Sequence, residues 1–160
     1  SGVIVDVKTT QDRNDSNLMS PMLDSFKSRY GRYPKQFLAD SHYPVKKDVE
    51  EALGNKIDVY CPSPKGRKNS TEASKKRLAR KRAKESQVLQ DWRAKMETEE
   101  AKIIRKRRGQ TEKIHGWMKS KMSFCQLKLR GLVGAQTEML LFSIAYNLKR
   151  YFNLAPLKTI

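Results

Sequence analysis

The side chains best suited to chemistry gather between residues 105 and 119, in the stretch RKRRGQTEKIHGWMK. On a helix that turns by about 100° per residue, one face of this stretch carries Arg105, Arg108, Glu112, His115 and Lys119. A single carboxylate therefore stands among cations. The opposite face has the spacing that packs a helix on a core, with Ile114, Trp117, Met118 and Met122. The charged face is then expected to point to a cleft or to solvent.

Taken alone, this charged face favours a simple interpretation as solvated surface. Arg108 and Glu112 stand four residues apart, and such a pair contributes only a few tenths of a kcal/mol to a helix. A catalytic interpretation of Glu112 needs a second acid that faces the same cleft.

Asp40 is that second candidate, at the end of the short apolar stretch KQFLAD, which predicts a strand over residues 35–40. In open α/β sheets, sites form just outside the carboxyl ends of strands, so a functional acid is expected at this position. The alternative, which the local sequence slightly favours, is a structural role. Asp40 or Ser41 could cap the helix expected over VKKDVEEALG at 45–54.

The elements that would position these acids are predicted from hydrophobic periodicity. Alternating apolar residues predict a strand over residues 3–9 with one well-buried face. Helical spacing predicts a helix from about residue 18 to residue 30, stopped by Gly31, and KIDVYCP at 56–62 predicts another strand. A last apolar helix within 127–155 is expected to be buried and to close the core.

The charge of the whole chain indicates a polyanionic partner. The chain has 34 Lys and Arg residues against 17 Asp and Glu residues, a formal net charge of +17. Nucleic acid is the first candidate, and no membrane partner is expected because the longest apolar run, at 139–146, is too short for a span. Cys61 and Cys125 give neither a disulfide framework nor a zinc pattern with His42 and His115, which fits a reducing, cytoplasmic compartment.

Residues 65–108 hold much of this charge, with 17 basic and 6 acidic side chains, so 17 − 6 = 11 positive charges. After the opening KGRKNS, the segment predicts one or two long exposed helices in an arm that contacts phosphates. Trp92 is expected to anchor this arm to the core rather than to stack on a base. The residues expected to bind DNA are Lys75, Lys76, Arg77, Arg80, Lys81, Arg82, Lys84, Arg105 and Arg107.

Two separated acids with a basic segment between them make the chain resemble, over nearly its whole length, the DDE transposases of bacterial insertion sequences. VIVDVKTTQDRNDSNLMSPML resembles the segment between the first two catalytic acids, and FLADSHY resembles the strand that delivers the second Asp. RGQTEKIHGWMK resembles the helix that carries the final Glu, and RGLVGAQTEMLLFSIAYNLKR resembles the terminal helix. In the subgroup with a Tyr-x2-Arg-x3-Glu-x6-Lys signature, the last three positions fall on Arg108, Glu112 and Lys119.

Three positions depart from the family pattern. Arg105 stands at the Tyr position of the signature, and His42 stands two residues after the second Asp, where Gly is frequent. The family's first catalytic Asp lies on the first strand of the sheet, whereas the strand predicted over 3–9 corresponds to the third. Asp6 therefore does not match it, and the resemblance implies a chain that begins after the first catalytic Asp.

The fold implied by the resemblance is α/β, with an RNase H-like mixed sheet flanked by helices, truncated at the N-terminus and carrying a basic helical insertion. Residues 1–62 would form the first part of the RNase H-like core. Residues 63–104 would form the insertion, and residues 105–160 would supply the C-terminal helices of the core.

The function implied is DNA transposition by metal-dependent strand cleavage and transfer. Asp40 and Glu112 would be catalytic ligands of Mg²⁺ or Mn²⁺, which take oxygen ligands, and Arg108 and Lys119 would neutralise phosphates beside the metals. The partners would be double-stranded DNA, at element ends and target, and a second copy in a full-length homodimer at the bacterial nucleoid. Lacking one Asp, this chain alone is expected to bind DNA without cutting it. The alternative is a non-catalytic basic nucleic-acid-binding protein in which both acids are structural.

Overall fold

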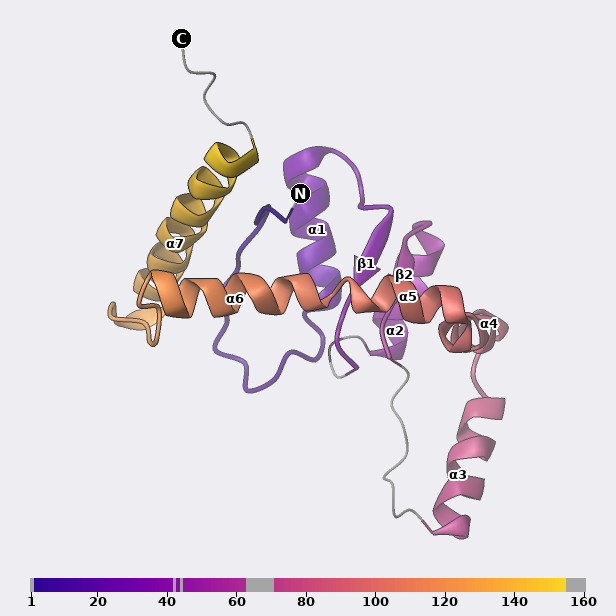
Figure 1. Cartoon of the computed structure of the whole chain (residues 1–160). Helices are drawn as coiled ribbons and strands as arrows, with labels where there is room; N and C mark the ends of the chain where they lie inside the picture. The colour runs from indigo at the N-terminus through magenta and orange to yellow at the C-terminus, as the bar shows by residue number, and fades with distance from the viewer. Residues whose placement is uncertain (1, 42, 44, 63–70, 155–160) are drawn as a thin grey trace. The chain divides into compact units, whose positions relative to one another are not determined.

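A computed structural model of the chain describes residues 2–41, 43, 45–62 and 71–154 (Figure 1). The chain divides into two compact units, one of residues 14–108 and the other of residues 1–13 with 109–160. His42 and the start of the predicted insertion, residues 63–70, lie outside the described residues. None of the helices within the described ranges has the length and apolar character needed to cross a membrane.

The unit of residues 14–108 opens with helix α1 (Met19–Tyr30), which confirms the predicted helix. Pro21 stands in its first turn, where a missing backbone N–H is tolerated. The helix ends at Gly31, whose φ of 70° is the left-handed conformation that favours glycine. The N–H of Gly31 donates to the carbonyl of Lys27 at 2.8 Å and so closes the last turn.

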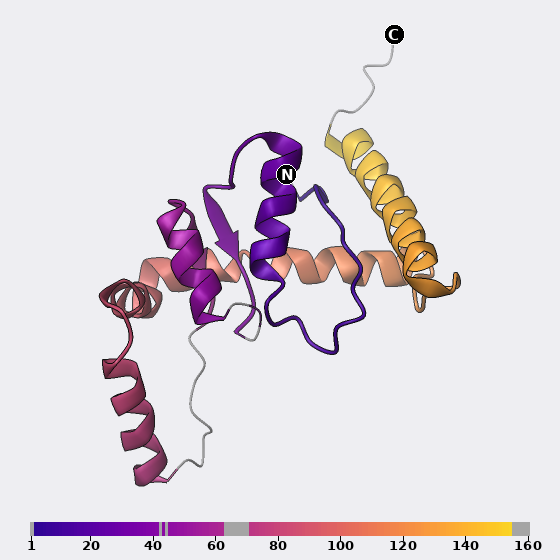
Figure 2. The ribbon, with the colours of Figure 1, turned by 180° about the vertical axis from the view of Figure 1, so that it is seen from behind.

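A β–α–β arrangement follows and forms the centre of this unit. Strand β1 (Gln36–Leu38) pairs in parallel with strand β2 (Asp58–Tyr60), with Phe37 opposite Val59. Helix α2 (Lys46–Gly54) connects them, and Figure 2 shows β1 between α1 and α2. Both predicted strands and the predicted helix between them are confirmed. The pair of strands fits the predicted α/β class, while the wider RNase H-like sheet stays a prediction.

Helices α4 (Gln87–Glu97) and α5 (Glu99–Lys106) complete the core of the same unit. Trp92 is only 6% exposed, and its indole N–H donates to the carbonyl of Val59 in β2 at 2.8 Å. The predicted tryptophan anchor is confirmed. Most side chains of these two helices are exposed, as in the predicted arm, but one face of the helices packs into the core. Its buried side chains are those of Leu89, Trp92, Met96 and Ala101.

Helix α3 (Glu72–Ala83) keeps the predicted exposed character, because it has no buried residue. Thr71 caps its first turn, where the Thr71 hydroxyl accepts a hydrogen bond from the backbone N–H of Ser74 at 3.4 Å. Glu72 in the first turn and three basic residues in the last turn also suit the helix dipole. The helix is therefore stabilised by its own sequence rather than by burial.

The second unit contains helices α6 (Gly109–Lys121) and α7 (Gly131–Leu154). The single helix expected over residues 105–119 is interrupted, because α5 ends at Lys106 and a turn precedes α6. The apolar face predicted for α6 is confirmed. Met118 is buried, and the Trp117 ring meets the Tyr146 ring of α7 edge-on, with 5.5 Å between centroids.

Residues 3–9 form no strand in the described part of the chain, so this prediction is wrong. Their backbone is hydrogen-bonded by the side chains of Asn147 and Gln136 on α7. A side-chain amide offers one donor group and one acceptor, as a neighbouring strand would. The segment can therefore satisfy backbone groups without a sheet.

Helix α7 differs from the buried helix that was expected. Leu141 and Ile144 are 61% and 62% exposed, and Leu148, Tyr151 and Phe152 are also exposed. Its covered side instead carries polar groups that have partners. Buried Glu138 accepts the backbone N–H groups of Lys128 and Leu129 at 2.8 and 3.0 Å.

Candidate functional site

Asp40 lies just beyond the carboxyl end of β1, as expected. The hydrogen bond from the N–H of Ala39 to the carbonyl of Tyr60, at 3.0 Å, is the last link between the two strands before Asp40. The carboxylate accepts the N–H of Ser41 at 2.6 Å, and the Asp40 carbonyl accepts the N–H of Tyr43 at 3.2 Å. Helix α2 has Val45 at its N-cap, so Asp40 does not cap it. The Asp40 side chain is 57% exposed and can be reached from solvent.

Arg108 lies beside this carboxylate, with 3.6 Å between Arg108 Nη1 and Asp40 Oδ2. Two backbone hydrogen bonds form the turn after α5 that places Arg108 there. The N–H of Arg107 donates to the carbonyl of Ile104, and the N–H of Arg108 donates to the carbonyl of Arg105, each at 3.0 Å. Both side chains are substantially exposed, so the pair contributes at most about 1 kcal/mol to stability. The pair matters more for chemistry than for stability, because it places a permanent cation next to an accessible acid.

Cys61 follows β2 at the same end of the strand pair. The pKa of its thiol is raised to about 11, mainly by burial and also by the carboxylate of Asp40, while Arg105 and Arg93 oppose this shift. The thiol therefore stays protonated near neutral pH and is a poor nucleophile. Arg105 and Asp40 therefore both act on the Cys61 thiol. The sequence signal for a thiol at this end of the sheet was the position of Cys61 at the end of the second predicted strand.

Glu112 and Lys119 belong to α6 in the other unit. Both are exposed, as is His115, which confirms that the charged face points away from the packed face. Glu112 lies in the first turn of its helix, where a carboxylate suits the helix dipole. Lys119 follows it by seven residues, which is two helical turns on the same side.

The structure thus brings Asp40 together with Arg108, and it places Glu112 with Lys119 on one helix. Each group is described within its own unit, so the pairing of Asp40 with Glu112 stays a prediction. Among the described residues, no group of three or more His, Cys, Asp and Glu side chains forms a cluster that could hold a metal ion.

The basic residues predicted to bind DNA are concentrated on α3. Lys75, Lys76, Arg77, Arg80 and Lys81 are exposed along this helix, and Arg82 in its last turn is half-buried. Lys75 pairs with Glu72 at 2.6 Å, but Glu72 is itself highly exposed and neutralises only one of these charges. Helix α3 therefore presents a surface dominated by cations.

Glu85, between α3 and α4, is a buried acid that the sequence reasoning did not single out. Its side chain is 4% exposed and accepts hydrogen bonds from Arg93 Nε and Nη2, at 2.6 and 3.1 Å. Lys46 of α2 lies 2.6 Å away. The bonds from Arg93, and then those from Lys46, lower the pKa of this carboxyl to about 2, although burial opposes them. The Glu85–Arg93 separation of eight residues was its only sequence signal.

These features define a strongly basic α/β protein with an accessible carboxylate at a strand end and a cationic helix. Comparison with protein families gives a match to the Transposase DDE domain over residues 1–148. The chain therefore belongs to the family of DDE transposases, which confirms the resemblance seen in the sequence. Neither a curated protein nor a solved structure matches the chain. The family makes DNA transposition the general function and DNA the partner.

Proposed function

We propose that this chain supplies two metal-binding carboxylates, Asp40 and Glu112, to the cleavage and transfer of DNA strands in transposition of a bacterial insertion sequence. The observation that carries the proposal is the exposed carboxylate of Asp40 beyond β1, with Arg108 at 3.6 Å. In open α/β sheets, sites form just outside the carboxyl ends of strands. The family membership of residues 1–148 supports the same reaction class.

The two acids fit the chemistry of Mg²⁺ or Mn²⁺. Both are exposed carboxylates, and these hard cations take oxygen ligands. When bound, two divalent ions supply activation of the attacking oxygen and stabilisation of the leaving oxygen in phosphoryl transfer. Asp40 and Glu112 would hold such ions together with a third carboxylate. Asp6 does not match the family position of that acid.

The cations near the acids have a separate role in this proposal. The guanidinium of Arg108 can bind the oxygens of a phosphate that reaches Asp40, and Arg105 adds a second cation at the Tyr position of the signature. Lys119, on the face of Glu112, would neutralise a phosphate in the same way. The cations of α3 would hold DNA by its backbone, which positions the duplex without reading bases. A homodimer working at the nucleoid would bring two element ends together.

The experiment is a nicking and metal-binding assay on the purified 160-residue chain with DNA that carries an element end. We expect DNA binding, weak Mn²⁺ binding that Asp40→Asn and Glu112→Gln each reduce, and no cleavage. Asp24→Asn, an exposed acid on α1, is the control for lost charge. The metal-site proposal fails if both site variants bind Mn²⁺ as the unmodified chain does. Metal-dependent cleavage that Asp40→Asn abolishes would show that another acid of this chain completes the site.

One observation favours the non-catalytic alternative. Asp40 Oδ1 already accepts the N–H of Ser41, and Oδ2 lies near Arg108, so both oxygens have structural neighbours. A purely structural Asp40 predicts that Asp40→Asn lowers the thermal midpoint of unfolding and leaves Mn²⁺ binding unchanged. The metal-site proposal predicts that Mn²⁺ raises this midpoint and that Asp40→Asn removes the increase.

A further inference from the structure

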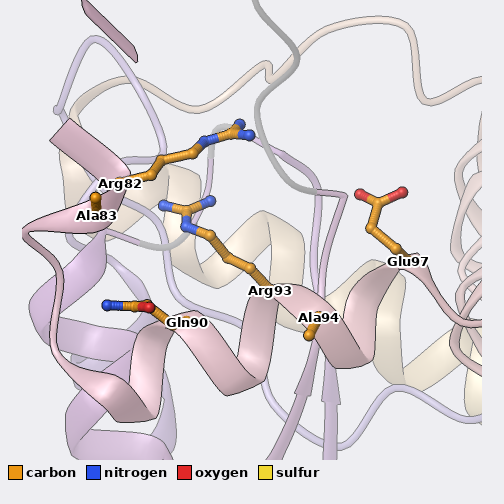
Figure 3. A pocket seen from close by; sticks show the side chains of 6 residues that line it. All are labelled: Arg82, Ala83, Gln90, Arg93, Ala94 and Glu97. Atoms are coloured by element: carbon orange, nitrogen blue, oxygen red, sulfur yellow. The ribbon is translucent and has the colours of Figure 1, made fainter. Parts of the chain in front are cut away.

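The elbow between α3 and α4 forms an open groove with a volume of about 330 Å³. Helix α4 contributes four residues at the spacing of a single helical stripe, and α3 contributes two from its last turn. The residues that line it are Arg82, Ala83, Gln90, Arg93, Ala94 and Glu97 (Figure 3). In Figure 3 the side chains of Arg82 and Arg93 project toward the same region between the two helices, while Glu97 lies further along α4.

Glu85, which does not itself line the groove, holds two of the polar side chains of the groove in place. The Glu85 carboxylate binds the Nε and Nη2 edge of the Arg93 guanidinium, so the Nη1 end is directed away from Glu85. Gln90 is also fixed, because its Nε2 donates to the backbone carbonyl of Glu85 at 2.9 Å. Donors that are already ordered lose little side-chain entropy when a ligand binds.

The groove carries a small excess of positive charge when Glu85 and its partner Lys46 are counted with the residues that line it. The cations are Lys46, Arg82 and Arg93, and the carboxylates are Glu85 and Glu97, so 3 − 2 leaves one positive charge. A phosphodiester group carries one negative charge and offers two oxygens that match the planar guanidinium. Ala83 and Ala94 are small, which leaves room in the groove for the sugars on either side of the phosphate.

We propose that this groove binds one phosphodiester group of the DNA backbone, held by Arg82 and Arg93 with Gln90 beside them. This inference rests on the proposed DNA-binding function and names one of its contact points. It goes beyond the general attraction of the α3 cations, because it assigns a bound phosphate to a formed cavity. It also gives the buried Glu85 a role as a positioning residue for Arg93.

The test measures the affinity of the full chain for a 20-base-pair duplex at several salt concentrations. Ala94→Met fills the groove and changes no charge, and Gln87→Met adds the same side chain at an exposed α4 position that does not line the groove. We expect Ala94→Met to weaken binding about tenfold and to reduce the salt slope by about 1, as for the loss of one phosphate contact. Gln87→Met should bind as the unmodified chain does. Far-UV circular dichroism checks that each variant is folded.

A double-mutant comparison separates a specific contact from general attraction. Arg82→Gln should weaken binding in the unmodified chain and have little further effect when Ala94→Met is present. Arg80→Gln removes the same charge from a part of α3 that does not line the groove, so its effect should be equal in both backgrounds. The groove assignment is overturned if Ala94→Met binds as tightly as Gln87→Met while the unmodified chain binds DNA. If the unmodified chain does not bind DNA, the proposed function itself is overturned together with the groove.

Discussion

The side chain of Asn147 binds both backbone groups of Ile4. Its Oδ1 accepts the N–H of Ile4 at 2.8 Å, and its Nδ2 donates to the carbonyl of Ile4 at 2.6 Å. Gln136 repeats the arrangement eleven residues earlier, accepting the N–H of Thr9 at 2.7 Å and donating to the carbonyl of Val7 at 2.9 Å. Eleven helical residues rise about 16 Å, and five extended residues span about the same length, so the two amides match the segment from Ile4 to Thr9.

Replacing these amides should release the N-terminal segment. Asn147→Leu leaves the donor and acceptor of Ile4 without their partners, and each broken hydrogen bond of this kind costs about 1 kcal/mol. Amide hydrogen exchange at Ile4 should become faster in Asn147→Leu, and exchange at Thr9 should become faster in Gln136→Leu. Asn153→Leu, near the exposed end of the same helix, is the control. Unchanged exchange at Ile4 in Asn147→Leu would contradict the importance of this contact.

This contact also explains why the sequence misled about residues 3–9. The alternation of Val3, Val5 and Val7 predicted a strand, but alternation does not reveal which groups bond to the backbone. Here the partners are two amides on a helix more than 120 residues away. Asn147 is half-buried on α7. Its partner could not be predicted, because no local pattern connects such distant residues.

The apolar face of α7 shows a second limit of sequence reasoning. Its spacing predicted a helix, and the structure has that helix, but the degree of burial depends on neighbours that the spacing does not describe. Around Asp40 the sequence performed better, because a short apolar run and a carboxylate at its end are both local features. The resemblance implied that Arg108 lies near the metals held by Asp40, but no local pattern shows the direct contact, which depends on how the turn after α5 folds.

The ion pairs of Glu85 predict a pH dependence of stability. The folded-state pKa of this carboxyl is lowered to about 2 from 4.5, so the unfolded chain binds its proton more readily. The resulting stability is fully present above about pH 4.5 and is lost as the pH falls toward 2. It amounts to about 2–3 kcal/mol. Urea unfolding should show a smaller loss between pH 6 and pH 3 in Glu85→Gln than in the unmodified chain.

Glu72 provides the matched control for this measurement. It also pairs with a lysine, Lys75 at 2.6 Å, but its side chain is highly exposed and the pair is screened by solvent. Glu72→Gln should therefore leave the pH dependence of unfolding almost unchanged. Equal pH dependence in Glu85→Gln and the unmodified chain would show that Glu85 is not an important ion-pair partner in the folded state.

Trp92 offers a test of the role of α4 in the core. Trp92→Phe removes the hydrogen bond to the carbonyl of Val59 and leaves a cavity where the larger ring had been. We expect a loss of about 2–4 kcal/mol in the free energy of unfolding. Trp117→Phe should cost less, because Trp117 is only half-buried. A near-zero effect of Trp92→Phe would instead favour an arm whose helices do not contribute to the core.

The cations of α3 should set the salt dependence of DNA binding. Each phosphate contact makes the slope of log affinity against log salt more negative by about 0.9. A variant in which Lys76, Arg77, Arg80 and Lys81 are all changed to Gln should therefore have a slope whose magnitude is smaller by up to about 4. These side chains are exposed and make no contribution to the core, so the variant should unfold at the same urea concentration as the unmodified chain. Lys27, Arg29, Arg32 and Lys35, changed together to Gln, remove the same charge from α1 and the chain that follows it, away from α3. Equal losses of affinity and slope in the two variants would mean that DNA responds to net charge, and α3 would no longer be the binding surface.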